Sequence, residues 1–257
     1  MPALTVLLPC YNEEQALPSL LAALRDTAAA LAPERTLNVL VVDDGSADNT
    51  AEIARRTVPG LDTVVVQHET NLGLGAALAT GVRWFLTHHD EDADVLAVMD
   101  ADGTHPPALL GQMLARLAGE TGTAPCDVVI ASRYAPGGEE HGLSTRRRFY
   151  SRTASRVLAL LAPIRGARDY TCGYRLYRRE TLAAAAEHYR KGLVTERSFV
   201  CMAELLIKLG RRGARVDEVP LKLHYELKEG ASKLNVPATI WRYGVLVAKL
   251  LFTRHFR

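Results

Sequence analysis

Short apolar segments alternate with helical patterns throughout the first half of this 257-residue chain, and this alternation constrains the fold more than any other feature. Each apolar segment has four or five residues between turn-forming residues, which is typical of strands buried on both faces of a parallel sheet. The expected strands are residues 4–8, 39–42, 63–66, 95–99 and 128–131. The expected helices between them are residues 14–31, 50–57, 75–86 and 107–117. Such alternation predicts a doubly wound, mostly parallel α/β sheet with right-handed crossovers.

Polar sequences follow four of the five expected strands. They are "CYNEE" after the first strand, "DDGS" after the second, "DADGTHP" after the fourth and "SRYAPGGEE" after the fifth. In open α/β sheets, ligands bind beyond the carboxyl ends of the strands. The sequence therefore predicts a binding site at this edge of the sheet.

The pattern changes after Arg133. A Gly-rich stretch at 135–142 and three arginines at 146–148 lead into a helix that reaches about residue 161. A loop at 165–177, two further helices and a strand at 215–223 follow, with the helices expected near 181–188 and 197–209. Because no repeat or linker divides the chain, we expect one domain over residues 1–235 with a C-terminal helix over 236–257. We also expect residues 135–148 to be mobile without ligand, because they are rich in glycine and arginine.

Several classes of protein are excluded by composition. The four cysteines lie far apart and form no CxxC pair, so a zinc site or a disulfide framework is not expected. No apolar run reaches about 18 residues, the length that a membrane-spanning helix needs. The first residues read as a strand and not as a signal peptide, because no basic segment precedes the apolar positions. We therefore expect a cytoplasmic protein.

Charge is divided between the two halves of the chain. Residues 1–125 hold 6 Lys/Arg and 17 Asp/Glu (net charge −11), and residues 126–257 hold 25 and 12 (net charge +13). An acidic half suits a metal cation, and a basic half suits phosphates or an anionic membrane surface. Two solvated surfaces that attract each other would give the same numbers.

Asp100 and Asp102 stand two residues apart at the end of an expected strand. Carboxylate oxygens are the ligands that Mg²⁺ or Mn²⁺ prefers, and such an ion shares its remaining positions with substrate phosphates. The alternative is that both acids only cap the helix that opens near Pro106. We expect His105 to form hydrogen bonds beside the metal and not to bind it.

Asp43 and Asp44 are adjacent acids at the end of the second expected strand, where they repel each other unless they meet a donor. A base N–H of a nucleotide is one such donor, and Pro9, Tyr11 and Glu13 would close the same pocket. The glycines in "NLGLGAALATG" follow the third strand and not the first, which argues against a dinucleotide-binding fingerprint.

Seven segments of the chain together resemble the family 2 inverting glycosyltransferases, and most closely the dolichol- or polyprenyl-phosphate mannose synthases. They occur in the family's order between about residues 4 and 234: "VLLPCYNEE", "VVDDGSADNT", "NLGLGAALATG", "MDADGTHPP", "SRYAPGG", "YTCGYRLYRRETL" and "VDEVPLKLHYELKEGASKL". The resemblance implies a GT-A fold, which is Rossmann-like, a nucleoside-diphosphate sugar donor, a Mg²⁺ or Mn²⁺ ion and a polyprenyl phosphate acceptor. We expect no nucleic acid partner.

The resemblance also implies roles for individual residues. Asp100 and Asp102 would hold the metal, with Thr104 as a further polar ligand, while Arg133 and Arg147 would grip phosphates. Asp169, Gly173 and Arg175 would lie on the acceptor side. The nucleotide and its phosphates would be bound by Pro9, Tyr11, Glu13, Val42, Asp44, Asp100, Ala101, Asp102, Arg133, Arg147, Ser151 and Lys233.

Three positions depart from the family pattern. Cys172 replaces the usual serine, Leu227 occupies a place where an arginine is common, and Glu69 stands where a basic residue is usual. Lys228 would have to take over the phosphate contact of the missing arginine. Two lost cations near the phosphates leave open another acceptor, such as an alcohol of a small molecule, a glycan or a protein, or another donor such as UDP-glucose or UDP-GlcNAc.

The expected reaction is displacement at the anomeric carbon of the sugar donor, with mannose favoured. The metal neutralises the charge that develops on the departing diphosphate. A lipid phosphate is already anionic, so it needs no strong general base. An alcohol acceptor would need one, and Asp169 is then the candidate.

The last helix has two faces on a helical wheel. Arg242 and Lys249 lie on a narrow polar face, and apolar residues that include Trp241 and Phe252 cover most of the rest. Such a helix suits the interface of a membrane, and the protein would then bind the cytoplasmic face peripherally. Packing against the domain or in a dimer would explain the same pattern.

Overall fold

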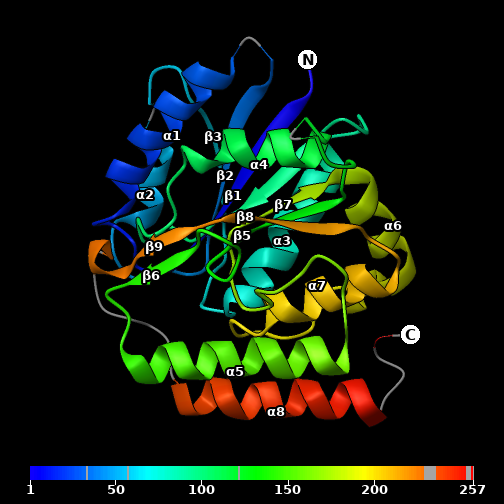
Figure 1. Cartoon of the computed structure of the whole chain (residues 1–257). Helices are drawn as coiled ribbons and strands as arrows, with labels where there is room; N and C mark the ends of the chain where they lie inside the picture. Colours follow the sequence, from blue (N-terminus) through cyan, green and yellow to red (C-terminus); the bar gives the residue numbers. More distant parts are fainter. Residues whose placement is uncertain (33, 57, 121, 229–235, 253–255, 257) are drawn as a thin grey trace.

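The computed structural model describes residues 1–256 except 33, 57, 121, 229–235 and 253–255. A seven-stranded sheet forms its centre, in the order β3-β2-β1-β4-β7-β5-β8 (Figure 1). The strands are β1 (Ala3–Cys10), β2 (Thr36–Asp43), β3 (Asp62–Gln67), β4 (Val95–Val98), β5 (Val128–Ser132), β7 (Arg175–Arg178) and β8 (Val216–Pro220). All five strands expected in the first half are present, and each overlaps its expected position.

Parallel pairing places the carboxyl ends of the first strands together. β1 pairs in parallel with both β2 and β4, and β2 pairs in parallel with β3. Every residue of β4 is buried, and so are seven of the eight residues of β1. Helices cover both faces of a parallel sheet, so strands with apolar residues on both sides are what this arrangement requires.

One strand of the sheet was not expected. Residues 175–178, most of which fall in the loop expected at 165–177, form β7 and run antiparallel between β4 and β5. Its sequence, RLYR, is short and half charged, so it carries no strand signal of its own. Contacts with other segments hold this strand in the sheet: the Arg175 side chain is fully buried and donates hydrogen bonds to the carbonyl oxygens of Met202 and Tyr170. The sheet is therefore mostly parallel, as expected, with the antiparallel β7 between β4 and β5.

The expected single strand at 215–223 divides into two. β8 ends at Pro220, and β9 (Lys222–His224) pairs instead in parallel with β6 (Glu139–His141). β6 lies inside the segment 135–148 that is expected to be mobile, so part of that segment is held in a small second sheet. Its mobility without ligand stays a prediction.

The helices agree with the expected pattern apart from shifts at their ends. They are α1 (Leu17–Leu31), α2 (Thr50–Arg55), α3 (Leu74–His88), α4 (Leu109–Ala118), α5 (Thr145–Leu161), α6 (Arg179–Tyr189), α7 (Cys201–Arg211) and α8 (Val236–Phe252), with short 3₁₀ turns at Arg190–Gly192 and Tyr225–Leu227. α5 and α8 lie side by side across one end of the molecule, at the bottom of Figure 1. Among the described residues, no helix is long and apolar enough to cross a membrane.

Candidate active site

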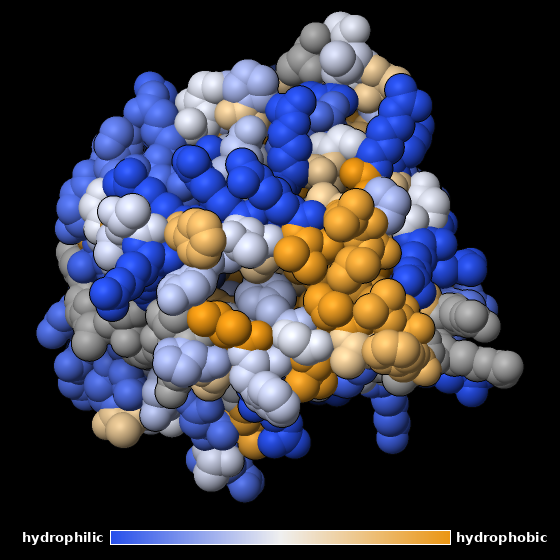
Figure 2. Space-filling view, turned by 60° about the horizontal axis from the view of Figure 1, so that its bottom comes forward, coloured by the Kyte–Doolittle hydropathy of each residue, from blue (hydrophilic) through white to orange (hydrophobic). Residues whose placement is uncertain are grey.

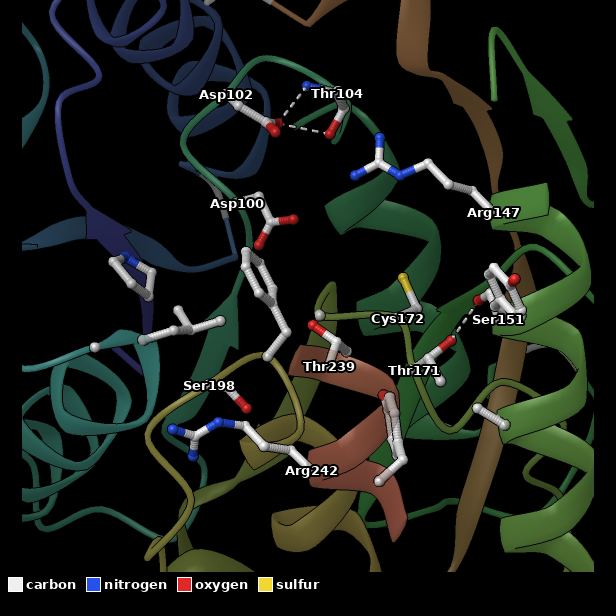
Figure 3. Close-up of a pocket in the computed structure, with 18 of the residues that line it drawn as sticks. Asp100, Asp102, Thr104, Arg147, Ser151, Thr171, Cys172, Ser198, Thr239 and Arg242 are labelled. Carbon is white, nitrogen blue, oxygen red and sulfur yellow. Dashed lines mark hydrogen bonds between the residues drawn. The ribbon is translucent and has the colours of Figure 1, made fainter. Parts of the chain in front are cut away.

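One large cavity, with a volume of about 820 Å³, lies at the carboxyl ends of β1, β2 and β4. It continues between α5 and α8, so that strand-end residues line one end and helix residues line the other (Figure 3). Eleven of the residues expected in the site line it: Pro9, Tyr11, Glu13, Asp44, Asp100, Ala101, Asp102, Thr104, Arg133, Arg147 and Ser151. Val42 and Asp169 do not line it, and Lys233 lies outside the described residues.

The turn after β4 presents both candidate metal ligands to the cavity. Asp102 Oδ1 accepts hydrogen bonds from the backbone N–H of Thr104 at 3.2 Å and from its hydroxyl at 2.6 Å (Figure 3). Thr104 therefore braces Asp102. The alternative that these acids cap α4 is not supported, because Ala108 occupies the N-cap and no side chain caps it.

His105 supports the same turn from behind. Its Nδ1 accepts a hydrogen bond from the backbone N–H of Asp100 at 2.9 Å, and its ring stacks on Tyr174 with 5.0 Å between centroids. The Tyr174 hydroxyl in turn donates to the carbonyl oxygen of Pro106 at 3.0 Å. The ring therefore holds the backbone of Asp100, as expected for a hydrogen-bonding neighbour of the site.

Lys228 reaches the site from the chain that follows β9 and forms an ion pair with Asp102 Oδ2. Burial opposes the charged ammonium, yet the hydrogen bond and the charge of Asp102 raise the pKa of Lys228 above its ordinary value. Burial likewise opposes a charged Asp102, but Lys228 and Thr104 lower the pKa of that carboxyl. Burial raises the pKa of Asp100, although His105 opposes the shift. One carboxylate of the turn thus has a cation beside it, and the other is the more easily protonated.

A divalent cation fits this turn. The carboxylates of Asp100, which is half-buried, and Asp102, which is buried, lie on one loop and line the cavity. Such oxygen donors suit Mg²⁺ or Mn²⁺. Among the described residues, no group of three or more His, Cys, Asp or Glu side chains is arranged to hold a metal. Two protein ligands are compatible with an ion that also takes oxygens from water and from substrate phosphates.

Asp44 also lines the cavity, but its carboxylate is already bound within the chain. Oδ1 accepts from the backbone N–H of Leu72 at 3.0 Å, Oδ2 accepts from that of Gly73 at 2.8 Å, and His68 Nδ1 lies 2.7 Å from Oδ1. Asp44 therefore fixes the loop before α3, which also lines the cavity through Gly73. Val42, expected beside the nucleoside, is fully buried in the sheet.

Arg133 and Asp169 form a buried ion pair at the edge of the cavity. Arg133 donates to both carboxylate oxygens, from Nε at 2.8 Å and from Nη2 at 2.7 Å, and Asp169 also accepts from the backbone N–H groups of Thr171 and Cys172. Although burial opposes the charge, Arg133 lowers the pKa of Asp169. A fully buried carboxylate with its oxygens occupied is poorly placed to act as a general base. This geometry assigns Asp169 to positioning Arg133.

Arg147 extends from α5 toward the turn of Asp102 and Thr104 (Figure 3). Its Nη1 donates to the hydroxyl of Tyr225 at 2.6 Å, and its guanidinium lies 4.9 Å from the centre of that ring. Ser151, one turn further along α5, shares a hydrogen bond of 2.9 Å with Thr171. The helix thus presents a positive charge and a hydroxyl to the same space.

Sequence reasoning missed most of the second end of the cavity. Residues from α8 and the loop before α7 line it together with α5: Tyr150, Val157, Arg197, Ser198, Phe199, Thr239, Ile240, Arg242, Tyr243 and Val247. The helical-wheel pattern of the last helix did predict its apolar face. It could not reveal that this face meets α5, because that contact joins segments about 90 residues apart.

The mouth of this end opens on an exposed apolar surface, which we call the α5–α8 surface. It comprises Phe149, Tyr150, Val157 and Leu160 of α5 with Ile240, Trp241, Leu251 and Phe252 of α8. Phe252 is 83%, Leu160 81% and Trp241 74% exposed. Figure 2 shows hydrophobic side chains gathered on this face beside a strongly hydrophilic area. Exposed apolar patches of this kind mark interaction sites.

Comparisons with known proteins identify the family of this chain. The sequence pattern of the family described as Glycosyl transferase family 2 matches residues 5–184. Polyprenol monophosphomannose synthase of Mycolicibacterium smegmatis is 34% identical over 232 residues, which cover 90% of this chain and 80% of that protein. Undecaprenyl-phosphate mannosyltransferase of Micrococcus luteus is 36% identical over 236 residues, which cover 91% and 88%.

Solved structures share the fold. Glucosyl-3-phosphoglycerate synthase of Mycobacterium tuberculosis, crystallised with Mn²⁺, UDP and phosphoglyceric acid, superposes with a TM-score of 0.63 at 21% identity, over 99% of this chain and 78% of that one. The same enzyme crystallised with Mg²⁺ and UDP gives a TM-score of 0.60 at 18% identity, over 97% and 78%. The expected GT-A fold is therefore confirmed.

Proposed function

Because the chain belongs to glycosyl transferase family 2, we propose that it moves a hexose, with mannose favoured, from a nucleoside-diphosphate sugar to a polyprenyl phosphate with inversion at the anomeric carbon. The printed names of the two relatives near 35% identity support mannose and a polyprenyl phosphate acceptor. The observation that carries the proposal is the single cavity that joins the Asp100–Asp102 turn to an apolar passage between α5 and α8.

The polar end of the cavity is suited to the donor. Asp100 and Asp102 would hold Mg²⁺ or Mn²⁺, which when bound neutralises charge on the departing diphosphate. Arg147 supplies a fixed positive charge from the facing helix, held in place by the hydroxyl and ring of Tyr225. Asp44 keeps the loop at Gly73 in position to close the nucleoside side. Lys233, which lies outside the described residues, remains our candidate for a further contact.

The acceptor would bring its own nucleophile. A polyprenyl phosphate is ionised at neutral pH, so its oxygen attacks the anomeric carbon without losing a proton to the protein. This suits a site in which Asp169 is bonded to Arg133 on both oxygens. Arginine guanidinium groups bind phosphate through paired hydrogen bonds, and Arg147 lies in the cavity to do so.

The second end of the cavity is suited to the lipid tail. Val157, Ile240 and Val247 line it, and its mouth lies within the α5–α8 surface. We therefore propose that this surface docks on the cytoplasmic face of a membrane. Arg146, Arg152 and Arg156 on exposed positions of α5 would face anionic lipid headgroups beside it. Docking would bring the mouth of the cavity to the lipid.

A donor and acceptor panel tests the proposal. Purified protein is given GDP-mannose, UDP-glucose or UDP-GlcNAc, with and without a polyprenyl phosphate, in Mn²⁺ or in EDTA, and nucleoside diphosphate release and glycolipid are measured. We expect transfer only with lipid phosphate and metal, and the most transfer with GDP-mannose. The anomeric configuration of the product, read from its one-bond C1–H1 NMR coupling, should be opposite to that of the donor. Transfer to phosphoglyceric acid instead, or equal turnover in EDTA, would contradict it.

A further inference from the structure

Lys228 occupies the one oxygen of Asp102 that the turn leaves for an external cation. Oδ1 of Asp102 is held by both donors of Thr104, whereas Oδ2 faces the Lys228 ammonium. The side chains of Lys228 and Asp102 are only 13% and 10% exposed, so little water lies between the pair and its surroundings. A metal cation bound through Oδ2 would have to displace this ammonium, because two positive charges on one carboxylate oxygen repel each other strongly in a buried site.

The backbone that carries Lys228 is packed directly against the acidic turn. Gly103 lies between Asp102 and Thr104 and has a φ of +79°. A Cβ at this position would lie 3.8 Å from the carbonyl oxygen of Leu227, the residue before Lys228. The base of the lysine side chain is therefore fixed beside the site, while its four-carbon stem is long enough to pivot.

The Tyr225 ring brings the Lys228 ammonium close to Arg147 while the ammonium stays paired with Asp102. The Lys228 Nζ lies 5.9 Å from the centre of the Tyr225 ring, and the Arg147 guanidinium lies 4.9 Å from the same ring. A nucleoside diphosphate bound beside Arg147 would present several negative charges within the reach of Lys228. The lysine can thus exchange one anionic partner for another without entering water.

From these contacts we propose that Lys228 is a resident counter-cation that couples the metal to the nucleotide. Without nucleotide it neutralises Asp102 and disfavours the metal; when a diphosphate binds, the ammonium moves to the phosphates and releases Asp102 Oδ2 to the ion. Metal and nucleotide then strengthen each other's binding, and this coupling is reciprocal. The inference rests on the metal site proposed above and adds the residue that controls its occupation.

Metal binding, measured without turnover, tests this inference. The free Mn²⁺ signal is followed by electron paramagnetic resonance during titration of the full chain, with and without GDP. In the unmodified protein we expect GDP to raise Mn²⁺ affinity by roughly 5- to 150-fold, the usual range of such coupling. In Lys228→Met we expect nucleotide-free Mn²⁺ affinity to rise by about tenfold or more, GDP affinity in the absence of metal to fall, and the coupling to shrink.

Lys222→Gln is the matched control, because Lys222 lies on β9 and pairs at the surface with Glu139 Oε1 at 3.1 Å. It removes the same charge away from Asp102 and should leave Mn²⁺ affinity unchanged. Thermal unfolding of each variant establishes that it is folded. Unchanged or weaker nucleotide-free Mn²⁺ binding in Lys228→Met would overturn the inference. If Asp102→Asn instead leaves Mn²⁺ binding intact in every state, the metal site of the proposed function fails as well.

Discussion

The two ends of the cavity are built in different ways. At the donor end, carboxylates emerge from buried strands and are held by several hydrogen bonds each, as Asp44 and Asp102 are. At the acceptor end, apolar side chains of two surface helices form the walls, and many of them are exposed. A buried polar group needs hydrogen-bond partners in defined directions, whereas an apolar passage is stabilised by the apolar surface area that it removes from water. The donor end should therefore respond sharply to single substitutions, and the acceptor end gradually.

The largest effect is expected at Asp169, which lies behind the cavity wall and holds Arg133. Asp169→Ala leaves the Arg133 guanidinium without its two-fold acceptor in a buried place, and should lower the free energy of unfolding by about 3–5 kcal/mol. Urea denaturation measures this loss. The double variant Asp169→Ala/Arg133→Met removes both charges and should recover part of it. A single variant as stable as the unmodified protein would show that the pair does not hold the wall.

At the donor end, Asp102→Asn should reduce transfer by about 10²–10³-fold, by comparison with the loss of one electrostatic stabiliser in other enzymes. The amide keeps the shape of the side chain but loses the charge that a metal requires. Nucleoside diphosphate release under saturating donor is the measurement. Asp48→Asn is the control, because this carboxylate accepts a hydrogen bond from the Thr50 N–H and does not line the cavity, and the variant should retain activity.

A third prediction concerns Glu204, which holds the loop before α7 by accepting hydrogen bonds from Thr195 and Glu196. Burial opposes its charge, but Lys208 and these donors lower its pKa from 4.5 to about 2. A carboxyl with a lowered folded-state pKa stabilises the protein above pH 4.5, and this contribution is lost as pH falls toward 2.

Glu204→Gln should therefore cost on the order of 2 kcal/mol of unfolding free energy at pH 7, and the difference from the unmodified protein should vanish as pH falls from 4.5 toward 2. Urea unfolding across that pH range tests the sign. A difference that grows on acidification would contradict the role of the charged form.

The smallest effect is expected at the acceptor end. Trp241→Glu removes one of several exposed apolar side chains of the α5–α8 surface and should weaken binding to anionic vesicles about tenfold, since burying a large apolar side chain contributes about 1.5–3 kcal/mol. Vesicle sedimentation at low and high salt is the measurement. Val64→Glu, on edge strand β3 and away from this surface, is the control. Equal losses in both variants would remove the docking proposal.

The donor end could be predicted well from sequence, because its residues follow local rules. Each acid directly follows an apolar strand, and parallel pairing brings those strand ends together, so Asp44, Asp100 and Asp102 were expected in one pocket and line one cavity. The role of Asp169 could not be predicted this way. Its partner Arg133 lies 36 residues earlier, and nothing near either residue indicates that they bond.

The sequence alone determined the parallel half of the sheet, the strand-end acids and the apolar character of the last helix, since each depends on the periodicity of neighbouring residues. Only the tertiary structure decided the antiparallel β7 inside the sheet, the pairing of Lys228 with Asp102 across 126 residues and the contact of α5 with α8. These features depend on burial and charge that distant segments contribute. The sequence around a short polar strand or a single lysine contains no pattern that predicts its partner.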